Sequence, residues 1–160
     1  MSTRHLTAIA MIAALYAVLT MALAPLSYGP VQLRISEILT VLPYFTPLAI
    51  PGLFIGAAIA NLLSPVGFYD VIFGSLASLI AAWLTARMPR PWLAPLPPVL
   101  VNAVIIGILL GTVSGLPVTV FAAMLYVGLG QLLVCYGLGL PFLYLLRRFR
   151  DHIPGARPKR

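Results

Sequence analysis

Four stretches of this chain contain no Asp, Glu, Lys or Arg, and together they cover most of it. They run over residues 5–33, 38–69, 71–86 and 91–146 of 160. The hydrocarbon core of a membrane offers no partner for exposed backbone N–H and C=O groups, so a chain crosses it as helices of about 20 apolar residues. The mean hydropathy of +1.05 agrees with such helices. The sequence therefore predicts an all-α, polytopic integral membrane protein.

Two of these stretches are too long for a single span. The last one contains a Gly- and Pro-containing break at 111–117, and the second carries Pro43, Pro47 and Pro51. Proline removes a backbone donor and favours a helix break. We therefore expect one membrane domain over 1–160 with six transmembrane helices and a basic tail at 148–160. The expected helices are 5–24, 35–46, 49–63, 69–86, 97–114 and 118–147.

The basic residues predict the orientation. Apart from Arg34, they lie near the chain ends or between apolar stretches, at positions 4, 87, 90, 147, 148, 150, 157, 159 and 160. Lys and Arg favour the cytoplasmic side. Both termini and Arg87 are then cytoplasmic, which requires an even number of spans with four of them before Arg87. Because the net charge of +7 is distributed in this way, nucleic acid is not expected as a partner, whereas membrane lipid is.

Arg34 and Glu37 differ from this pattern. The chain has only three acidic residues, and this pair lies between long apolar stretches in a connection predicted to face outward. Charged groups at such positions face a cavity, pair with each other or hold a ligand. The pair therefore indicates a polar binding site, although an i,i+3 structural ion pair would also explain it.

Further polar residues are expected beside this pair on the outer side. The candidate substrate-binding set is Glu37, Arg34, Gln32, Asp70, Asn61, Gln131 and Tyr28. Each also has a plainer interpretation: Asp70 as a helix N-cap, the amides as interhelical hydrogen bonds, and Tyr28 as an interfacial aromatic. Asn102 is expected near the inner end of its helix, away from the cluster.

Small residues recur at four-residue spacing, at Ala10/Ala14, Ala13/Ala17, Gly52/Gly56 and Gly107/Gly111. This spacing lets helix backbones approach closely. Packing inside the bundle explains it most simply. The alternative is that the first helix presents Ala10, Ala13, Ala14 and Ala17 to another subunit.

Several other classes of protein are not supported. The stretch 6–24 is long for a signal peptide, and Pro25 after its small residues would hinder cleavage. Lys159 is the single lysine, so no P-loop is present. Cys135 is alone, and both histidines lie near the ends, so neither a disulfide, a metal site nor a Ser-His-Asp set is expected. The sequence predicts no enzyme activity and no cofactor.

Five segments resemble the QueT transporter family. They are SYGPVQLRISEILTVLP at 27–43, PGLFIGAAIAN at 51–61, DVIFGSLAS at 70–78, PPVLVN at 97–102 and CYGLGLP at 135–141. The first segment is specific, and the resemblance covers roughly residues 5 to 145.

The resemblance implies a fold, a substrate and partners. It implies a six-helix S component, the substrate-binding subunit of an energy-coupling factor transporter in the bacterial cell membrane. Its partners would be a transmembrane coupling subunit and two cytoplasmic ATPase subunits. The substrate would be a queuosine precursor, 7-cyano- or 7-aminomethyl-7-deazaguanine. The alanines of the first helix would contact the coupling subunit.

A deazaguanine would suit the candidate residues. Glu37 or Asp70 would accept from its N–H and amine donors, and Gln32, Asn61 or Gln131 would serve its carbonyl. Tyr28, Phe68 and Tyr69 could stack on its ring. Arg34 would keep Glu37 ionised and oriented.

Three alternatives remain open at this stage. The chain could be an S component for another vitamin, such as riboflavin or thiamine. It could be a stand-alone proton-coupled carrier with Glu37 or Asp70 as the proton site. It could also be a structural subunit without a ligand.

Overall fold

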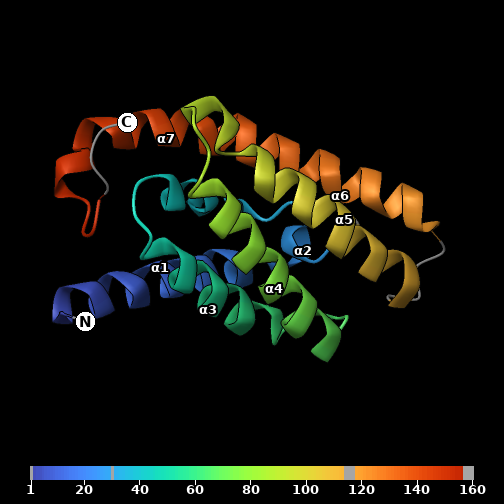
Figure 1. Cartoon of the computed structure of the whole chain (residues 1–160). Helices are drawn as coiled ribbons and strands as arrows, with labels where there is room; N and C mark the ends of the chain where they lie inside the picture. Colours follow the sequence, from blue (N-terminus) through green and yellow to red (C-terminus); the bar gives the residue numbers. More distant parts are fainter. Residues whose placement is uncertain (1, 30, 114–117, 157–160) are drawn as a thin grey trace.

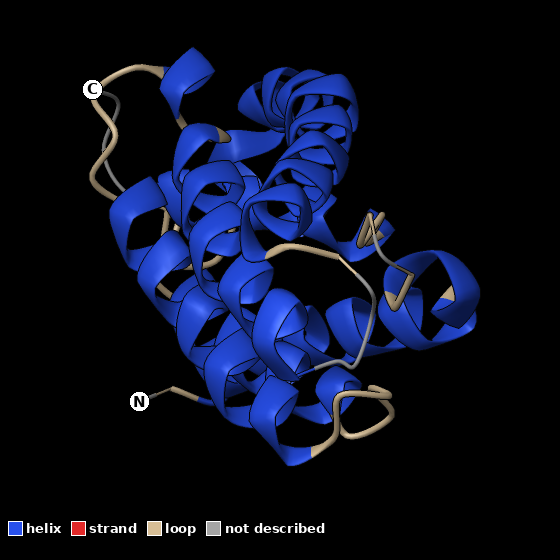
Figure 2. Ribbon diagram, turned by 90° about the vertical axis from the view of Figure 1, so that its right-hand side faces the viewer, coloured by secondary structure: helices blue, strands red, loops and turns tan. Residues whose placement is uncertain are grey.

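The computed structural model of the chain describes residues 2–29, 31–113 and 118–156. Within these ranges the regular elements are helices, and no strand occurs (Figure 2). The longer helices are α1 (Thr3–Ala22), α3 (Ala49–Asn61), α4 (Phe68–Thr85), α5 (Leu96–Val113) and α6 (Val120–Val134). The shorter elements are α2 (Ala24–Ser27), the 3₁₀ helices η1 (Ile35–Tyr44), η2 (Pro91–Leu93) and η4 (Arg147–His152), the π-helical turn η3 (Cys135–Gly139) and α7 (Leu140–Leu146).

The expected all-helical class is confirmed. Four continuous helical segments are long and apolar enough to cross a membrane: Thr3–Ala22, Phe68–Thr85, Pro91–Val113 and Val120–His152. Each corresponds to one expected span. The expected short helices at 35–46 and 49–63 correspond to η1 and α3, which are apolar but shorter. The count of six spans therefore stays a prediction. Most of the expected break at 111–117 and the last four residues of the basic tail lie outside the described residues.

Successive long helices pack against each other, α1 on α3, α3 on α4, α4 on α5 and α5 on α6. Glycines make the closest approaches. A Cβ at Gly56 would lie 2.8 Å from the carbonyl oxygen of Ala13 on α1, and one at Gly107 would lie 2.5 Å from the Cα of Met124 on α6. These glycines therefore serve internal packing, as their spacing indicated.

The η1 helix lies in the middle of this bundle, in contact with α1, α4 and η3. Its ten residues form an unusually long 3₁₀ segment, since such runs rarely exceed three or four residues. Ser36, Glu37 and Thr40 are buried on it among apolar neighbours. This element therefore brings polar side chains into the core.

The two ends of the bundle differ in charge. Figure 1 shows both chain ends at one end of the bundle and the α3–α4 connection at the other. A hydrogen bond of 2.8 Å from Thr46 Oγ1 to the Pro154 carbonyl ties the turn before α3 to the C-terminal segment. Arg4 and the arginines of η4 lie at this end, which we call the basic end. Arg34 lies near the opposite end, beside the α3–α4 connection.

Candidate functional site

The guanidinium of Arg34 holds the opposite end of the bundle together. Its Nε donates to Gln32 Oε1 at 2.8 Å and to the Ser27 carbonyl at 3.3 Å, and NH1 donates to Asn61 Oδ1 at 2.9 Å. Its NH2 lies 3.2 Å from Asp70 Oδ2. Every guanidinium nitrogen is therefore engaged, and the side chain is buried.

The ion pair joins Arg34 to Asp70, so the expected pair between Arg34 and Glu37 is wrong. Arg34 precedes η1 in an extended conformation, with φ −87° and ψ 102°. The two residues therefore do not share a helical face, as an i,i+3 pair requires. Among the described residues this is the ion pair that the site contains, and its carboxylate comes from α4.

Asp70 is not a helix N-cap. The N-cap of α4 is Gly67, with φ 69°, and Asp70 lies in the first turn. One carboxylate oxygen pairs with Arg34, while the other, Oδ1, is buried without a hydrogen-bond partner among the described residues. Asn61 links α3 to this turn, because its Nδ2 donates to the Asp70 carbonyl at 2.9 Å. Gly74 leaves room for this amide, since a Cβ there would collide with it.

Glu37 has a different environment. Its Oε1 accepts a 2.6 Å hydrogen bond from the Tyr16 hydroxyl of α1, while Oε2 is buried with no partner among the described residues. A buried carboxylate oxygen without a donor is costly and calls for an explanation. The sequence does not predict Tyr16 in the site, because its position within an apolar helix resembles that of an ordinary core residue.

Asn102 and Gln131 meet across the α5–α6 pair. Asn102 Nδ2 donates to Gln131 Oε1 at 3.1 Å, and Cys135 Sγ lies 3.5 Å from the same oxygen. The expectation that Asn102 lies away from the cluster is therefore wrong. Asn102 is 11 residues before the end of α5, and Gln131 is 11 residues after the start of α6. At 1.5 Å per residue both lie at the same depth, and their positions relative to the 111–117 break could have indicated this.

These groups surround a small cavity of about 10 Å³. It is lined by Gln32, Arg34, Glu37, Asn102, Ile106, Val127 and Gln131. Four residues of the expected set therefore face one space, and Asn102 joins them. Asn61 and Asp70 do not line it but hold Arg34 from behind. The cavity is about the size that one water needs.

Tyr28 closes the other side of Arg34. Its ring centroid lies 5.6 Å from the guanidinium carbon, a cation–π distance, and its hydroxyl donates to the Ala60 carbonyl of α3. Burial raises the pKa of this phenol, so it stays a donor. Phe68 and Tyr69 are 74% and 54% exposed and do not line the cavity.

The chain from Tyr28 to Arg34 packs directly on α6. A Cβ at Gly130 would collide with the carbonyl oxygen of Val31. Gln32 adopts φ 52°, a left-handed conformation that is uncommon for residues other than glycine. This close approach carries Gln32 and Arg34 towards Gln131.

The four alanines of α1 divide into two pairs. Ala13 and Ala17 are each 5% exposed, inside the bundle, whereas Ala10 and Ala14 are exposed. Ala13 and Ala17 therefore offer no open surface to a partner, while Ala10 and Ala14 do.

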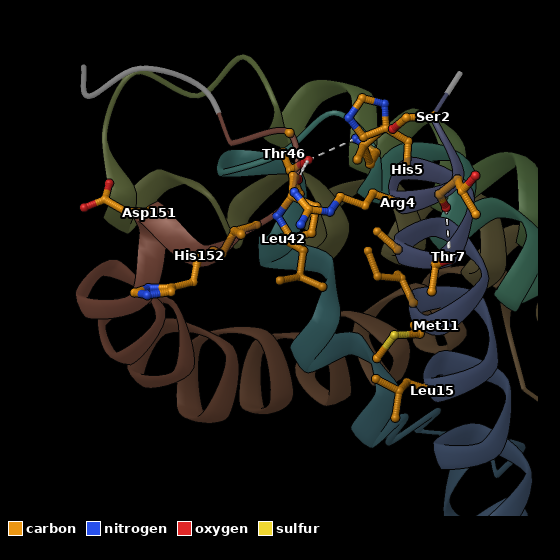
Figure 3. A pocket seen from close by; sticks show the side chains of 17 residues that line it. Ser2, Arg4, His5, Thr7, Met11, Leu15, Leu42, Thr46, Asp151 and His152 are labelled. Atoms are coloured by element: carbon orange, nitrogen blue, oxygen red, sulfur yellow. Dashed lines mark hydrogen bonds between the residues drawn. The ribbon is translucent and has the colours of Figure 1, made fainter.

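A second and much larger pocket, of about 1020 Å³, lies at the basic end. Its walls come from the first half of α1, from Leu42 and Leu48, and from residues 151–155. Figure 3 shows Arg4 and His5 on the α1 side of it, and Met11 and Leu15 further along the helix. This pocket is mainly apolar and contains no residue of the Arg34 cluster.

The fold and the cavity define a helical membrane protein with a buried polar site near one end. Comparison with known families agrees. The family described as QueT transporter matches residues 6–148, so the chain belongs to the QueT transporter family. The resemblance of the five segments is thereby confirmed.

One curated relative is the queuosine precursor transporter QueT of Lactococcus lactis subsp. cremoris (strain MG1363). It is 42% identical over 80 residues, which cover 49% of this chain and 47% of the relative. The chain therefore aligns with about half the length of that protein. No solved structure matches the chain.

Asp70→Asn should destabilise the protein strongly. It leaves the Arg34 charge buried without a counter-charge, and breaking a buried pair in this way costs about 3–5 kcal/mol. Thermal unfolding of the detergent-purified variant should show a lower Tm than wild type.

Asp151→Asn is the matched control, because Asp151 is exposed at the basic end and surface changes are usually within about 0.5 kcal/mol. Equal Tm values for the two variants would contradict the structural role of the Arg34–Asp70 pair.

Proposed function

We propose that this chain is the substrate-binding membrane subunit of a transporter for a queuosine precursor, 7-cyano- or 7-aminomethyl-7-deazaguanine. The observation that carries the proposal is the unpaired Oε2 of Glu37 beside a cavity lined with amide side chains. Membership of the QueT transporter family and the name of the relative support the choice of substrate.

The donor and acceptor groups of the cavity suit a guanine-like edge. The ring N–H and exocyclic amine of a 7-deazaguanine are donors, which Glu37 accepts. Its carbonyl is an acceptor, which an amide N–H of Gln131 or Gln32 serves. Hydrogen bonds to a charged group are worth about 1.5–3 kcal/mol net each. Glu37 is therefore assigned the central contact.

Arg34 has a supporting role in this proposal. Its nitrogens are occupied by Gln32, Asn61 and Asp70 and by the Ser27 carbonyl. It therefore does not orient Glu37, as the sequence suggests, but fixes the 28–34 segment beside α3 and α4. Asp70 neutralises Arg34, and this leaves Glu37 for the substrate.

Entry of the substrate requires movement. Ligand pockets are usually about 300–1,000 Å³, and the cavity at Glu37 is about 10 Å³. The 28–34 segment is the natural element to move, because it lies over the cavity and rests on Gly130 without a regular helix of its own. Its displacement would widen the space between η1 and α6.

We assign the basic end to the cytoplasm and the Arg34 end to the outside. Among the described residues, the arginines other than Arg34 are those at 4, 87, 90, 147, 148 and 150. They flank the helices at the basic end, as the positive-inside rule requires of cytoplasmic segments. The binding site would then face the outer side of the bacterial cell membrane.

Energy for transport would come from partner chains, as in an S component. The chain has one lysine, Lys159, and hence no P-loop. The coupling subunit would bind the exposed face of α1 at Ala10 and Ala14. The apolar pocket at the basic end adjoins this face, since Thr7, Met11 and Leu15 line it. Two ATPase subunits would act through that partner.

Glu37→Gln should weaken binding of 7-cyano-7-deazaguanine by about 10- to 150-fold, the equivalent of one lost charge-assisted hydrogen bond. The amide keeps an oxygen for Tyr16 but places an NH₂ group where the substrate donors need an acceptor. Calorimetric titration in detergent measures the change, with Asp151→Asn as the matched acid-to-amide control.

Unchanged affinity in a folded Glu37→Gln variant would remove Glu37 from the site. A folded wild-type chain that binds neither deazaguanine would exclude the proposed substrate. Uptake without any ATPase subunit would instead favour a proton-coupled carrier, for which the buried Glu37 carboxylate is the candidate proton site.

Ala14→Phe should prevent assembly with the coupling subunit while leaving substrate affinity unchanged. An unaccommodated side chain at a packed contact costs about 1–3 kcal/mol, which weakens association about 5- to 150-fold. Co-purification of the tagged chain with its partner measures the effect. Leu133→Trp, at a residue 60% exposed on α6, is the enlarged control, and equal losses in both variants would contradict a contact on α1.

A further inference from the structure

The amide of Gln131 is held in one orientation by two neighbours. Its Oε1 accepts from Asn102 Nδ2 at 3.1 Å and from the Cys135 thiol at 3.5 Å. All three side chains are buried, at 4% exposure or less. An amide has one oxygen and one NH₂ group. When donors engage the oxygen, the NH₂ group is the part that the amide can offer to a ligand.

Asn102 is the stronger of these two donors. An amide N–H at 3.1 Å lies within the usual range for N–H···O bonds, whereas a thiol is a weak donor. Cys135 also lies 3.9 Å from Thr40 Oγ1, so its hydrogen is shared among acceptors. The orientation of Gln131 therefore depends mainly on residue 102.

We propose that Asn102 is a positioning residue that turns the NH₂ group of Gln131 towards the substrate, and so makes the site select a ligand carbonyl at this point. The inference rests on the proposed function, because it assigns a specificity to the same cavity. It gives Asn102 a task that its place in an apolar helix did not indicate. Glu37 recognises the donors of the substrate, and the Asn102–Gln131 pair recognises its acceptor.

The chemical consequence is discrimination between acceptors of different strength. A carbonyl oxygen accepts the Gln131 N–H well, and a thiocarbonyl sulfur accepts it poorly. The 6-thio analogue of 7-cyano-7-deazaguanine keeps the ring N–H and the amine that Glu37 requires. The ratio of the two dissociation constants therefore reports on Gln131 alone.

Asn102→Asp changes the orientation with almost no change of size. An ionised carboxylate at position 102 only accepts, so Gln131 would turn its NH₂ group towards that carboxylate and its oxygen towards the substrate. The wild-type chain should bind the oxo ligand about tenfold or more tighter than the thio ligand, because a buried polar group left unpaired costs about that factor. In Asn102→Asp the ratio should fall to about one.

Two further variants complete the test, each checked for a monodisperse, folded sample. Asn102→Ala deletes the donor without supplying an acceptor and should lower the ratio partway. Cys135→Ser keeps a donor and should leave the ratio as in wild type. Calorimetric titration with both ligands gives all the ratios.

The outcomes separate the two proposals. If the wild-type chain binds neither ligand, the proposed function fails, and this inference fails with it. If the wild-type chain binds the oxo ligand, but Asn102→Asp and Asn102→Ala weaken both ligands equally, the function stands. In that case Asn102 is a structural residue, and the inference is overturned.

Discussion

The buried charge of Arg34 is the constraint on which the site depends. Removing a guanidinium from water is expensive unless it is paired and hydrogen-bonded throughout. Its partners come from the end of α2, the following segment, the end of α3 and the first turn of α4. Satisfying this one side chain therefore fixes the relative positions of these elements. The binding cavity lies on the other side of the same residue.

This arrangement divides the work between two carboxylates. Asp70 neutralises Arg34, so Glu37 is not consumed by the ion pair. Tyr16 satisfies only one Glu37 oxygen, and the long 3₁₀ segment η1 carries the other towards the amides of α5 and α6. The same polar cluster thus provides a rigid support and one unsatisfied acceptor, which is the combination that a neutral, donor-rich ligand requires.

Much of the fold could be predicted from charge-free stretches and prolines, because the membrane restricts the chain to helices. The polar residues of the site could also be identified, since few others exist. Their pairing could not. Spacing suggests Arg34 with Glu37, but Arg34 lies outside the helix that begins at Ile35. Distance from one helix end places Asn102 away from the site, although its equal distance from the α5–α6 turn is the better guide. Tyr16 gives no signal within an alanine-rich helix.

The most direct test of this account is a crystal structure of the chain with bound 7-cyano-7-deazaguanine. We predict that the ring N–H and amine of the ligand lie within hydrogen-bond distance of Glu37 Oε2, with the 28–34 segment displaced and the Arg34–Asp70 pair intact. A ligand that contacts Asp70 or Arg34 in place of Glu37, or that lies in the pocket at the basic end, would contradict the account.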